Sequence, residues 1–310
     1  PQGEYDLRCA LADYVRERRN VVTAPEHIVV GAGVQMLLEI LCVLLKGRRT
    51  VSFPDGSFVQ GSTVFAAHGY TVRTRYKDAD IIYVSPSHMN RQGDVMPIQR
   101  RLELCAHSAD TGAVVIEDDF ENDFLYSSTP TPSLYALGSG NVVYMGAFSA
   151  LLLPGIRISF MVLSPALAAA YHQMKDTFAQ TASKTEQIAL CAYLRDGNMK
   201  SRTKKIRRLY TGKAKTLCAL LAKALPDHPV RVGENGLQVQ IETPMLPDSA
   251  PFEQAGLALY IVKEKSGKNI VVVSPSAVPA DRLEEAAHAV AAALYKGEET
   301  AKAKQSKNIY

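Results

Sequence analysis

The stretch that decides the fold is VVYMGAFSALLLPGIRISFMV, residues 142–162. An apolar segment runs into a turn of small residues, and a second apolar segment follows Arg157. Ser149 and Arg157 flank the turn, with Ala150 and a run of leucines between them. In α/β proteins ligands bind where strands end in this way. The sequence therefore predicts a ligand site around the turn, with no reactive side chain at its centre.

The composition is that of an ordinary globular protein. The 310 residues are 47% hydrophobic and 21% charged, with a formal net charge of +4, and such a chain can form a large and a smaller domain. No run of about 18 apolar residues occurs, so we predict no membrane-spanning helix. The first residues lack the pattern of a signal peptide and begin within a helical pattern. We therefore expect a cytoplasmic protein, and we expect residues to precede this chain.

Cysteine usage argues against a disulfide framework and against a metal site. The five cysteines are odd in number and widely spaced, with no CxxC pair and no Cys/His cluster. They are Cys9, Cys42, Cys105, Cys191 and Cys218. We expect free thiols, mostly buried, in a reducing compartment.

Apolar strand patterns alternate with helical patterns over the first half of the chain. The strands are expected at 27–33, 50–53, 70–75, 80–87, 112–119 and 141–149. The helices are expected at 5–18, 34–47, 57–69 and 97–109. This alternation predicts an α/β domain with a largely parallel sheet.

The pattern changes after Pro165. Long helices are expected at about 165–195 and 199–225, followed by strands at 236–242, 257–262 and 269–273 and a closing helix at 279–295. We expect the last dozen residues to be a frayed tail. These patterns predict a large domain over 1–190, then connecting helices and a small α+β domain over 191–310.

Four strand ends carry residues suited to a ligand site. The Gly-rich turn GAGVQ (31–35) opens a helix, and its amides suit a phosphate. A polar loop, SPSHMNRQG (85–93), follows one strand, and three acids in IEDDF (116–120) end another. Arg157 precedes a strand and could hold an anion. Each feature also has a structural explanation, namely a change of chain direction, solvated loop acids, helix capping or a surface arginine.

Five blocks, in order, carry a family resemblance. They are residues 1–33, SPSHMNRQGDVMPIQRRLELC (85–105), VIEDDFENDFLY (115–126), YMGAFSALLLPGIR (144–157) and SRTKKIRRLY (201–210). Together they resemble the aminotransferase-like domain of MocR-type regulators of the GntR superfamily, in which a helix-turn-helix domain precedes a pyridoxal-phosphate (PLP) domain. The resemblance implies fold type I of PLP enzymes, a three-layer α/β sandwich with a mostly parallel sheet and a smaller C-terminal α+β domain. It also implies a homodimer.

The resemblance assigns cofactor contacts to several residues. Asp118 stands where the family's aspartate meets the pyridine nitrogen and keeps it protonated. Arg157 stands at the phosphate-binding arginine, and the amides of Gly33 and Val34 stand at the phosphate cup. Phe58 stands at the aromatic residue that stacks on the cofactor ring. These residues predict a flat anionic pocket.

Departures from the family motif concern the chemistry. Ala150, directly after Ser149, stands where the family has lysine, and only a primary amine can bond to the cofactor's aldehyde carbon and then shuttle a proton. Phe120 replaces a tyrosine that bonds the cofactor's phenolic oxygen. Asn90 begins the stretch NRQG in place of the family's proline-containing loop and could supply a polar contact. With Ser149, Phe120 and Asn90 complete our set of predicted cofactor contacts.

The small domain departs from the family too. Its segment NIVVVSPS (269–276) has valines in the region where the family carries an arginine for the substrate carboxylate. The loss of lysine, tyrosine, arginine and proline loop together favours natural loss of the catalytic site over an engineered alanine.

Other conspicuous residues are left with open roles. The basic stretch KSRTKKIRRLYTGKAK (200–215) lacks interleaved aromatic residues for stacking on nucleic acid, so we expect a solvated helix face or a contact with a partner subunit or another domain. His88 could contact a ligand. Tyr126 and Tyr135 could lie over the pocket or at a dimer interface.

Three hypotheses follow. In the first, the chain is the effector-sensing domain of a MocR-type regulator, catalytically inactive, which binds a small anionic ligand or PLP noncovalently and reaches DNA only through a helix-turn-helix domain outside this chain. In the second, it is a PLP-dependent aminotransferase whose cofactor lysine was mutated to alanine. In the third, it is a structural subunit that binds no ligand and acts by dimerising. None involves a metal or a membrane.

Overall fold

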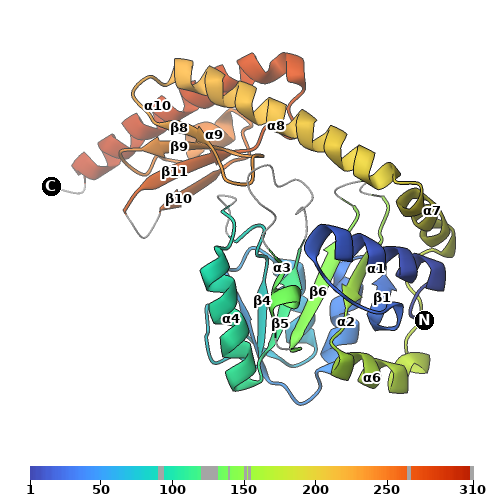
Figure 1. Ribbon diagram of the computed structural model, residues 1–310. Helices are drawn as coiled ribbons and strands as arrows, with labels where there is room; N and C mark the ends of the chain where they lie inside the picture. The colour runs from blue at the N-terminus through green and yellow to red at the C-terminus, as the bar shows by residue number, and fades with distance from the viewer. Residues whose placement is uncertain are drawn as a thin grey trace. The chain divides into compact units, whose positions relative to one another are not determined.

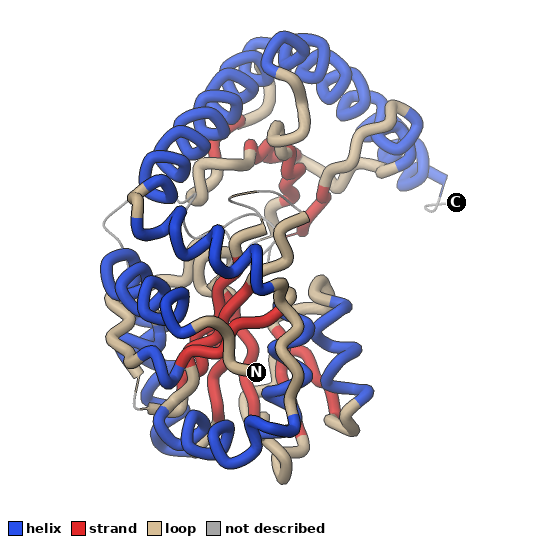
Figure 2. Tube along the Cα trace, turned by 90° about the vertical axis from the view of Figure 1, so that its right-hand side faces the viewer, coloured by secondary structure: helices blue, strands red, loops and turns tan. Residues whose placement is uncertain are grey.

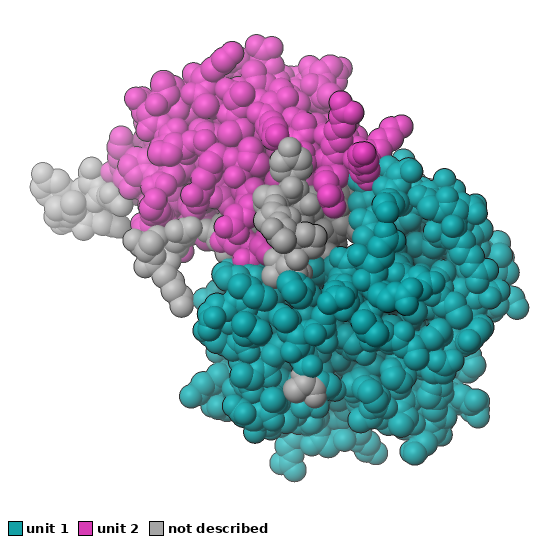
Figure 3. All heavy atoms as spheres, in the orientation of Figure 1, with its two compact units in different colours: residues 1–89, 96–123, 128–203 teal, residues 90–95, 124–127, 204–310 magenta. Residues whose placement is uncertain are grey.

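The computed structural model describes residues 1–89, 94–119, 132–138, 140–149, 152, 155–263 and 267–307. The chain divides into two compact units (Figure 3). The first comprises residues 1–89, 96–123 and 128–203, and the second comprises residues 90–95, 124–127 and 204–310. Each unit has its own apolar core.

A seven-stranded sheet forms the centre of the first unit. Its strands are β1 (Ile28–Gly31), β2 (Thr50–Phe53), β3 (Thr71–Thr74), β4 (Ile81–Val84), β5 (Val114–Asp118), β6 (Val142–Ala147) and β7 (Ser159–Val162). Their order is β1-β7-β6-β5-β4-β2-β3, and β7 alone runs antiparallel to its neighbours. The prediction of a mostly parallel sheet is therefore confirmed.

Helices cover both faces of this sheet, which gives the expected three layers (Figures 1 and 2). The helices are α1 (Tyr5–Arg19), α2 (Val34–Leu44), α3 (Val59–Ala67), α4 (Ile98–Thr111), α5 (Leu134–Leu137), α6 (Pro165–Met174) and α7 (Lys184–Arg195). Helices α2, α3 and α6 pack on one face, and α4 and α5 pack on the other. Helix α1 lies on the side of α5, because the Ser133 hydroxyl that caps α5 also donates to the Arg19 carbonyl.

The single helix predicted over 165–195 is wrong. Helix α6 ends at Met174, a 3-10 turn follows at Lys175–Thr177, and α7 begins only after Ser183, whose hydroxyl caps it. Between them the chain turns back toward β1. The Gln180 side-chain amide donates to the Val30 carbonyl, and the Thr181 hydroxyl accepts from the Ala32 N–H. These long-range hydrogen bonds interrupt the helix at a place where the local sequence pattern would let it continue.

The second unit has an antiparallel sheet covered by two long helices. Its elements are α8 (Asn198–Ala224, which begins in the first unit), β8 (Val230–Val232), β9 (Val239–Thr243), α9 (Ala250–Gln254), β10 (Tyr260–Lys263), β11 (Asn269–Val273) and α10 (Leu283–Lys307). The strand order is β10-β11-β9-β8, and residues of α8 and α10 share the core that covers the sheet. Among the described helices, none is both long and apolar enough to cross a bilayer.

The closing helix is longer than the sequence suggested. Helix α10 continues to Lys307, so the expectation of a frayed last dozen residues is wrong for most of them. The extension is held by tertiary contacts, since Lys304 forms an ion pair with Asp248 and α10 packs on α9. Short elements such as β8 and α9 had no clear sequence signal.

Candidate functional site

Several strand ends meet at one edge of the large sheet. The carboxyl ends of the parallel strands lie there, and the antiparallel β7 begins there. Ser159 of β7 pairs with Gly31 on one side and with Ala147 on the other. Residues just beyond these pairs, including Gly33, Ser149 and Arg157, therefore leave the sheet at the same edge.

The predicted site residues follow this edge in spatial order. Gly33 follows β1, Arg157 precedes β7, Ser149 follows β6, Asp118 ends β5 and Phe58 lies beyond β2. Asp118 and the start of β7 are two strands apart, about 10 Å across the sheet. The remaining predicted positions, Asn90, Phe120 and Ala150, lie outside the described residues.

Gly33 and Arg157 lie in direct contact. Gly33 has a φ of +94°, and a Cβ atom at this position would lie 2.7 Å from Nη2 of Arg157. Only glycine meets both demands at low cost. Gly33 is also the N-cap of α2, so the exposed guanidinium lies beside the first amides of that helix. A guanidinium beside a helix N-terminus is suited to an anion such as a phosphate.

The structure corrects one expected donor. The N–H of Gly33 donates to the carbonyl of Gly31 at 3.0 Å, so Gly33 provides space and not the amide we predicted. Val34 is the first residue of α2, where helical amides have no carbonyl partner within the helix. The turn itself is supported by Thr181, whose Oγ1 accepts from the Ala32 N–H at 2.9 Å. Sequence reasoning missed Thr181, because it is far from the turn in the chain.

Asp118 is buried and is held by a tyrosine that the sequence reasoning also missed. The Tyr83 hydroxyl donates to Oδ2 of Asp118. Both side chains are buried, with residue exposures of 3% for Tyr83 and 6% for Asp118. Burial, and then the charge of Asp118, raise the pKa of Tyr83 well above its ordinary value. Tyr83 therefore remains a proton donor to this carboxylate at any ordinary pH.

An aromatic wall adjoins this carboxylate. The ring centroids of Phe58 and Tyr83 are 5.3 Å apart, and those of Phe53 and Tyr83 are 5.0 Å apart. Phe58 can lie there because residue 61 is glycine: a Cβ on Gly61 would be 2.2 Å from a carbon of the Phe58 ring. The ring of Tyr83 therefore lies between Phe58, the predicted stacking residue, and Asp118.

The two acids beside Asp118 have structural roles. Asp119 accepts from Arg19 Nε at 2.6 Å, from Ser87 at 2.7 Å and from Tyr144 at 2.8 Å. Glu117 accepts from the first amides of α5, and burial followed by the charge of Asp119 raise the pKa of Glu117 to about 7. Successive strand residues point to opposite faces. Glu117 therefore caps a helix, as one expected explanation has it, whereas Asp119 forms an ion pair with Arg19. Of the three acids, only Asp118 faces the core beneath α2 and α3.

The other residues with open roles in the sequence have no demonstrated part in this site. Burial lowers the pKa of His88 to about 4, against the opposing charge of Asp119, so the imidazole is neutral at pH 7. The Tyr135 hydroxyl donates to the carbonyl of Leu163, and Tyr126 lies outside the described residues. In the basic stretch, several side chains lie on the exposed face of α8, among them Arg202, Lys204, Lys205 and Arg208.

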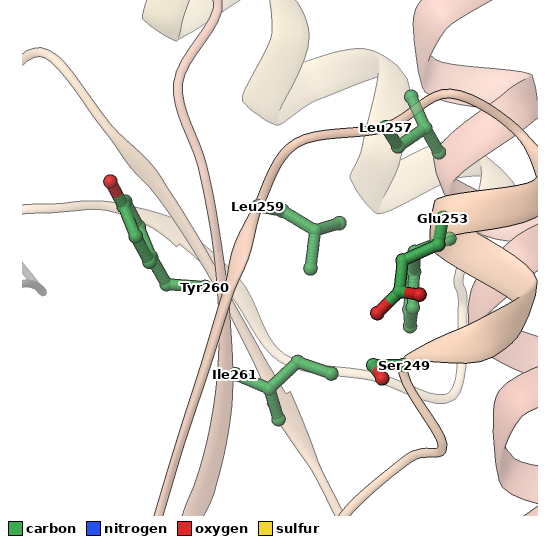
Figure 4. A pocket seen from close by; sticks show the side chains of 7 residues that line it. Ser249, Glu253, Leu257, Leu259, Tyr260 and Ile261 are labelled. Atoms are coloured by element: carbon green, nitrogen blue, oxygen red, sulfur yellow. The ribbon is translucent and has the colours of Figure 1, made fainter.

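Two pockets are lined by none of the sheet-edge residues. One, of about 290 Å³, lies between α9 and β10, where Leu259 and Ile261 point toward Glu253 while Tyr260 points away (Figure 4). The other, of about 330 Å³, lies among α1, the end of α7 and the start of α8. Its charged side chains include Glu17 and Lys200, which pair with each other.

The residues of the sheet edge fit PLP. The cofactor has a phosphate, a flat aromatic ring and a ring nitrogen that carries a proton. Arg157 and the start of α2 supply positive charge around a space that a Cβ would fill. Phe58 supplies an aromatic surface, and the buried Asp118 supplies a carboxylate. Such a set of groups is chemically suited to an anionic aromatic ligand.

Comparisons with known proteins agree with this geometry. The chain is 30% identical over 288 residues to an uncharacterised HTH-type transcriptional regulator, YdeL, of Bacillus subtilis, covering 88% of this chain and 60% of that protein. It is 28% identical over 254 residues to the probable rhizopine catabolism regulatory protein MocR of Rhizobium meliloti, covering 77% of this chain and 51% of that protein. The chain thus spans little more than half the length of these regulators.

The fold and the family follow from two further matches. An archaeal alanine:glyoxylate aminotransferase structure superimposes with a TM-score of 0.79 at 21% identity, over 95% of this chain and 81% of that chain, which shows the fold. The family model of aminotransferase class I and II matches residues 1–280. The predicted resemblance is confirmed: this chain belongs to the class I and II aminotransferase family, and its relatives include MocR-type regulators.

Proposed function

We propose that this chain is the effector-sensing domain of a MocR-type transcription regulator and that it binds PLP, or a similar anionic aromatic ligand, without a covalent bond. The observation that carries the proposal is the contact of Arg157 with Gly33 on the same sheet edge as Asp118, in a chain with Ala150 at the family's lysine position. Binding groups are retained there, and the reactive amine is absent.

Each residue has a defined part in holding the ligand. Arg157 and the Val34 amide bind the phosphate, and Asp118 accepts a hydrogen bond from the protonated ring nitrogen. Phe58 packs on the ring and excludes water from one side. Ser149 adds a polar contact near the phosphate. When bound, PLP supplies a ring that can withdraw electrons. Ala150 cannot bond to its aldehyde carbon, so the proposed domain binds its effector but catalyses no reaction on it.

The partners in this proposal follow from the relatives. Several are named HTH-type transcriptional regulators, and the chain matches only part of their length. We place DNA binding in a helix-turn-helix domain outside this chain, in a cytoplasmic homodimer. Ligand binding at the sheet edge would then alter the affinity of that domain for DNA.

Calorimetric titration with PLP tests the proposal. The unmodified chain should bind PLP saturably, and Arg157→Ala and Asp118→Ala should each weaken binding about tenfold or more, since each removes a charged partner. Arg202→Ala is the control, because it removes an exposed arginine on α8, far along the chain from the edge. No saturable heat from the folded chain would support the third hypothesis, a structural subunit, and overturn this one.

The enzyme hypothesis is tested with an amino donor. The match to an aminotransferase family keeps this candidate open. Ala150→Lys restores the amine, and production of a keto acid by this variant alone would show that only the lysine separates the chain from an enzyme. No product from either protein agrees with the loss of several catalytic groups. Product from the unmodified chain would contradict our proposal.

A further inference from the structure

We propose that Tyr83 is the positioning residue of the site: its hydrogen bond to Asp118 fixes the charge and direction of the carboxylate that meets the ligand's ring nitrogen. This inference rests on the proposed function and adds a residue to it. Neither the family resemblance nor the sequence pattern had pointed to Tyr83.

The strand register places Tyr83 for this role. Tyr83 of β4 pairs with Ile116 of the neighbouring parallel β5, and Asp118 lies two residues further along β5. Residues two apart on a strand share a face, so Tyr83, Ile116 and Asp118 face the same side of the sheet. The long tyrosine side chain reaches diagonally along this face and donates to Oδ2 of Asp118.

Packing holds the hydroxyl in place. The Tyr83 ring lies between Phe53, with centroids 5.0 Å apart, and Phe58, with centroids 5.3 Å apart. Phe53 is itself held edge-on by Phe65 of α3. A buried ring with aromatic neighbours on two sides has no room to rotate its hydroxyl away. The donor is therefore preorganised before any ligand enters.

The chemistry of the carboxylate depends on this donor. A hydrogen bond from a neutral hydroxyl to a carboxylate stabilises its ionised form and is strong in a buried site. An ionised carboxylate in turn stabilises a protonated ring nitrogen. Without the donor, the proton shared by Asp118 and the ligand shifts toward Asp118. Tyr83 thus sets the protonation state of the bound ring while touching the ligand only through Asp118.

Tyr83→Phe tests the inference, because it keeps the aromatic ring and removes only the hydroxyl. We expect PLP to bind about tenfold more weakly, the size of one hydrogen bond to a charged group. With PLP labelled with ¹⁵N in its ring, we also expect the nitrogen resonance to move from the protonated toward the unprotonated position. Asp118→Asn should remove the difference between Tyr and Phe at position 83.

Tyr70→Phe is the matched control. Tyr70 is also buried in the first unit, packs edge-on against Phe65 and donates to the Cys42 carbonyl at 3.0 Å. This variant loses a hydroxyl of the same kind without touching Asp118, so its affinity and its ¹⁵N position should match those of the unmodified chain.

The outcomes separate this inference from the proposed function. If the unmodified chain binds no PLP, both fail. If it binds PLP but Tyr83→Phe behaves like Tyr70→Phe in affinity and in ¹⁵N position, the role of Tyr83 alone is overturned. Should Tyr83→Phe not fold, 3-fluorotyrosine at position 83 keeps the ring and strengthens the donor; the shared proton should then lie further toward the ring nitrogen, and an unchanged ¹⁵N position would overturn the inference.

Discussion

Gly33 and Arg157 lie so close that a Cβ on residue 33 would be 2.7 Å from Nη2 of Arg157. The two residues are far apart in the sequence and come together because β1 and β7 are paired strands. The space between a positive φ glycine and a guanidinium, at the start of α2, is the part of the site most specific for an anion.

Gly33→Ala should therefore weaken anion binding. The methyl group has to displace the guanidinium and also strains a backbone at φ +94°. We expect PLP affinity to fall about tenfold or more in a calorimetric titration. Gly47→Ala is the control, because Gly47 has a φ of +105° but no atom within 4 Å of its added Cβ. Equal losses of affinity in both variants would show that backbone strain, and not the contact with Arg157, is responsible.

Gly61→Ala should displace Phe58. The added Cβ would lie 2.2 Å from the Phe58 ring, which must swing off Tyr83. We expect a change in the tyrosine near-ultraviolet circular dichroism, which is readable because the protein has no tryptophan, and weaker PLP binding. Gly212→Ala, on the exposed face of α8 with no neighbour within 4 Å, should leave both unchanged and stabilise the helix by about 0.5–1 kcal/mol. An unaltered spectrum for Gly61→Ala would count against the Phe58 position.

Arg19→Met should destabilise the first unit strongly. Arg19 and Asp119 form a buried ion pair that fixes the end of α1 beside the site strand, and removing one partner leaves a buried charge. We expect a loss of about 3–5 kcal/mol in the free energy of unfolding, measured with urea. Arg16→Met removes an exposed pair with Asp13 and should cost no more than about 1 kcal/mol. Similar losses in the free energy of unfolding for the two variants would contradict a structural role for Asp119.

Stability should fall as pH rises through the titration range of Glu117. In the folded protein, burial and then the charge of Asp119 raise the pKa of Glu117 to about 7, from an ordinary value of 4.5. Between these values the folded protein binds more protons than the unfolded chain, so the free energy of unfolding decreases with increasing pH. The contribution is on the order of 3 kcal/mol.

Glu117→Gln isolates this contribution. The variant should show a smaller loss of stability between pH 5 and pH 8 than the unmodified chain in urea unfolding. Glu103→Gln, at an exposed carboxylate on α4, serves as control. The same pH dependence in all three proteins would refute the titration of Glu117.

Much of the fold follows from local patterns. The strand predicted at 50–53 is β2, Thr50–Phe53, because an apolar β-rich run is bounded on both sides by polar or turn residues. Local patterns fail where tertiary contacts decide. Thr181 and Gln180 break the predicted helix by bonding to the β1 segment, and Lys304 extends the last helix by pairing with Asp248.

The same distinction holds for the site. Asp118, Arg157 and Gly33 could be proposed from motif spacing, because the family motif fixes their place at strand ends. Tyr83 and Thr181 could not, since their importance lies in partners far along the chain. Glu117 and Asp119 have the same residue chemistry as Asp118, and only the alternation of side chains along β5 tells the three apart.

The most direct test of the central claim is mass spectrometry after borohydride reduction of the chain mixed with one equivalent of PLP. If the site holds PLP without a covalent bond, the unmodified chain binds it in calorimetry but gains no stoichiometric mass on reduction, while Ala150→Lys gains the mass of one reduced cofactor. A stoichiometric covalent product in the chain with Ala150 in place would contradict the account.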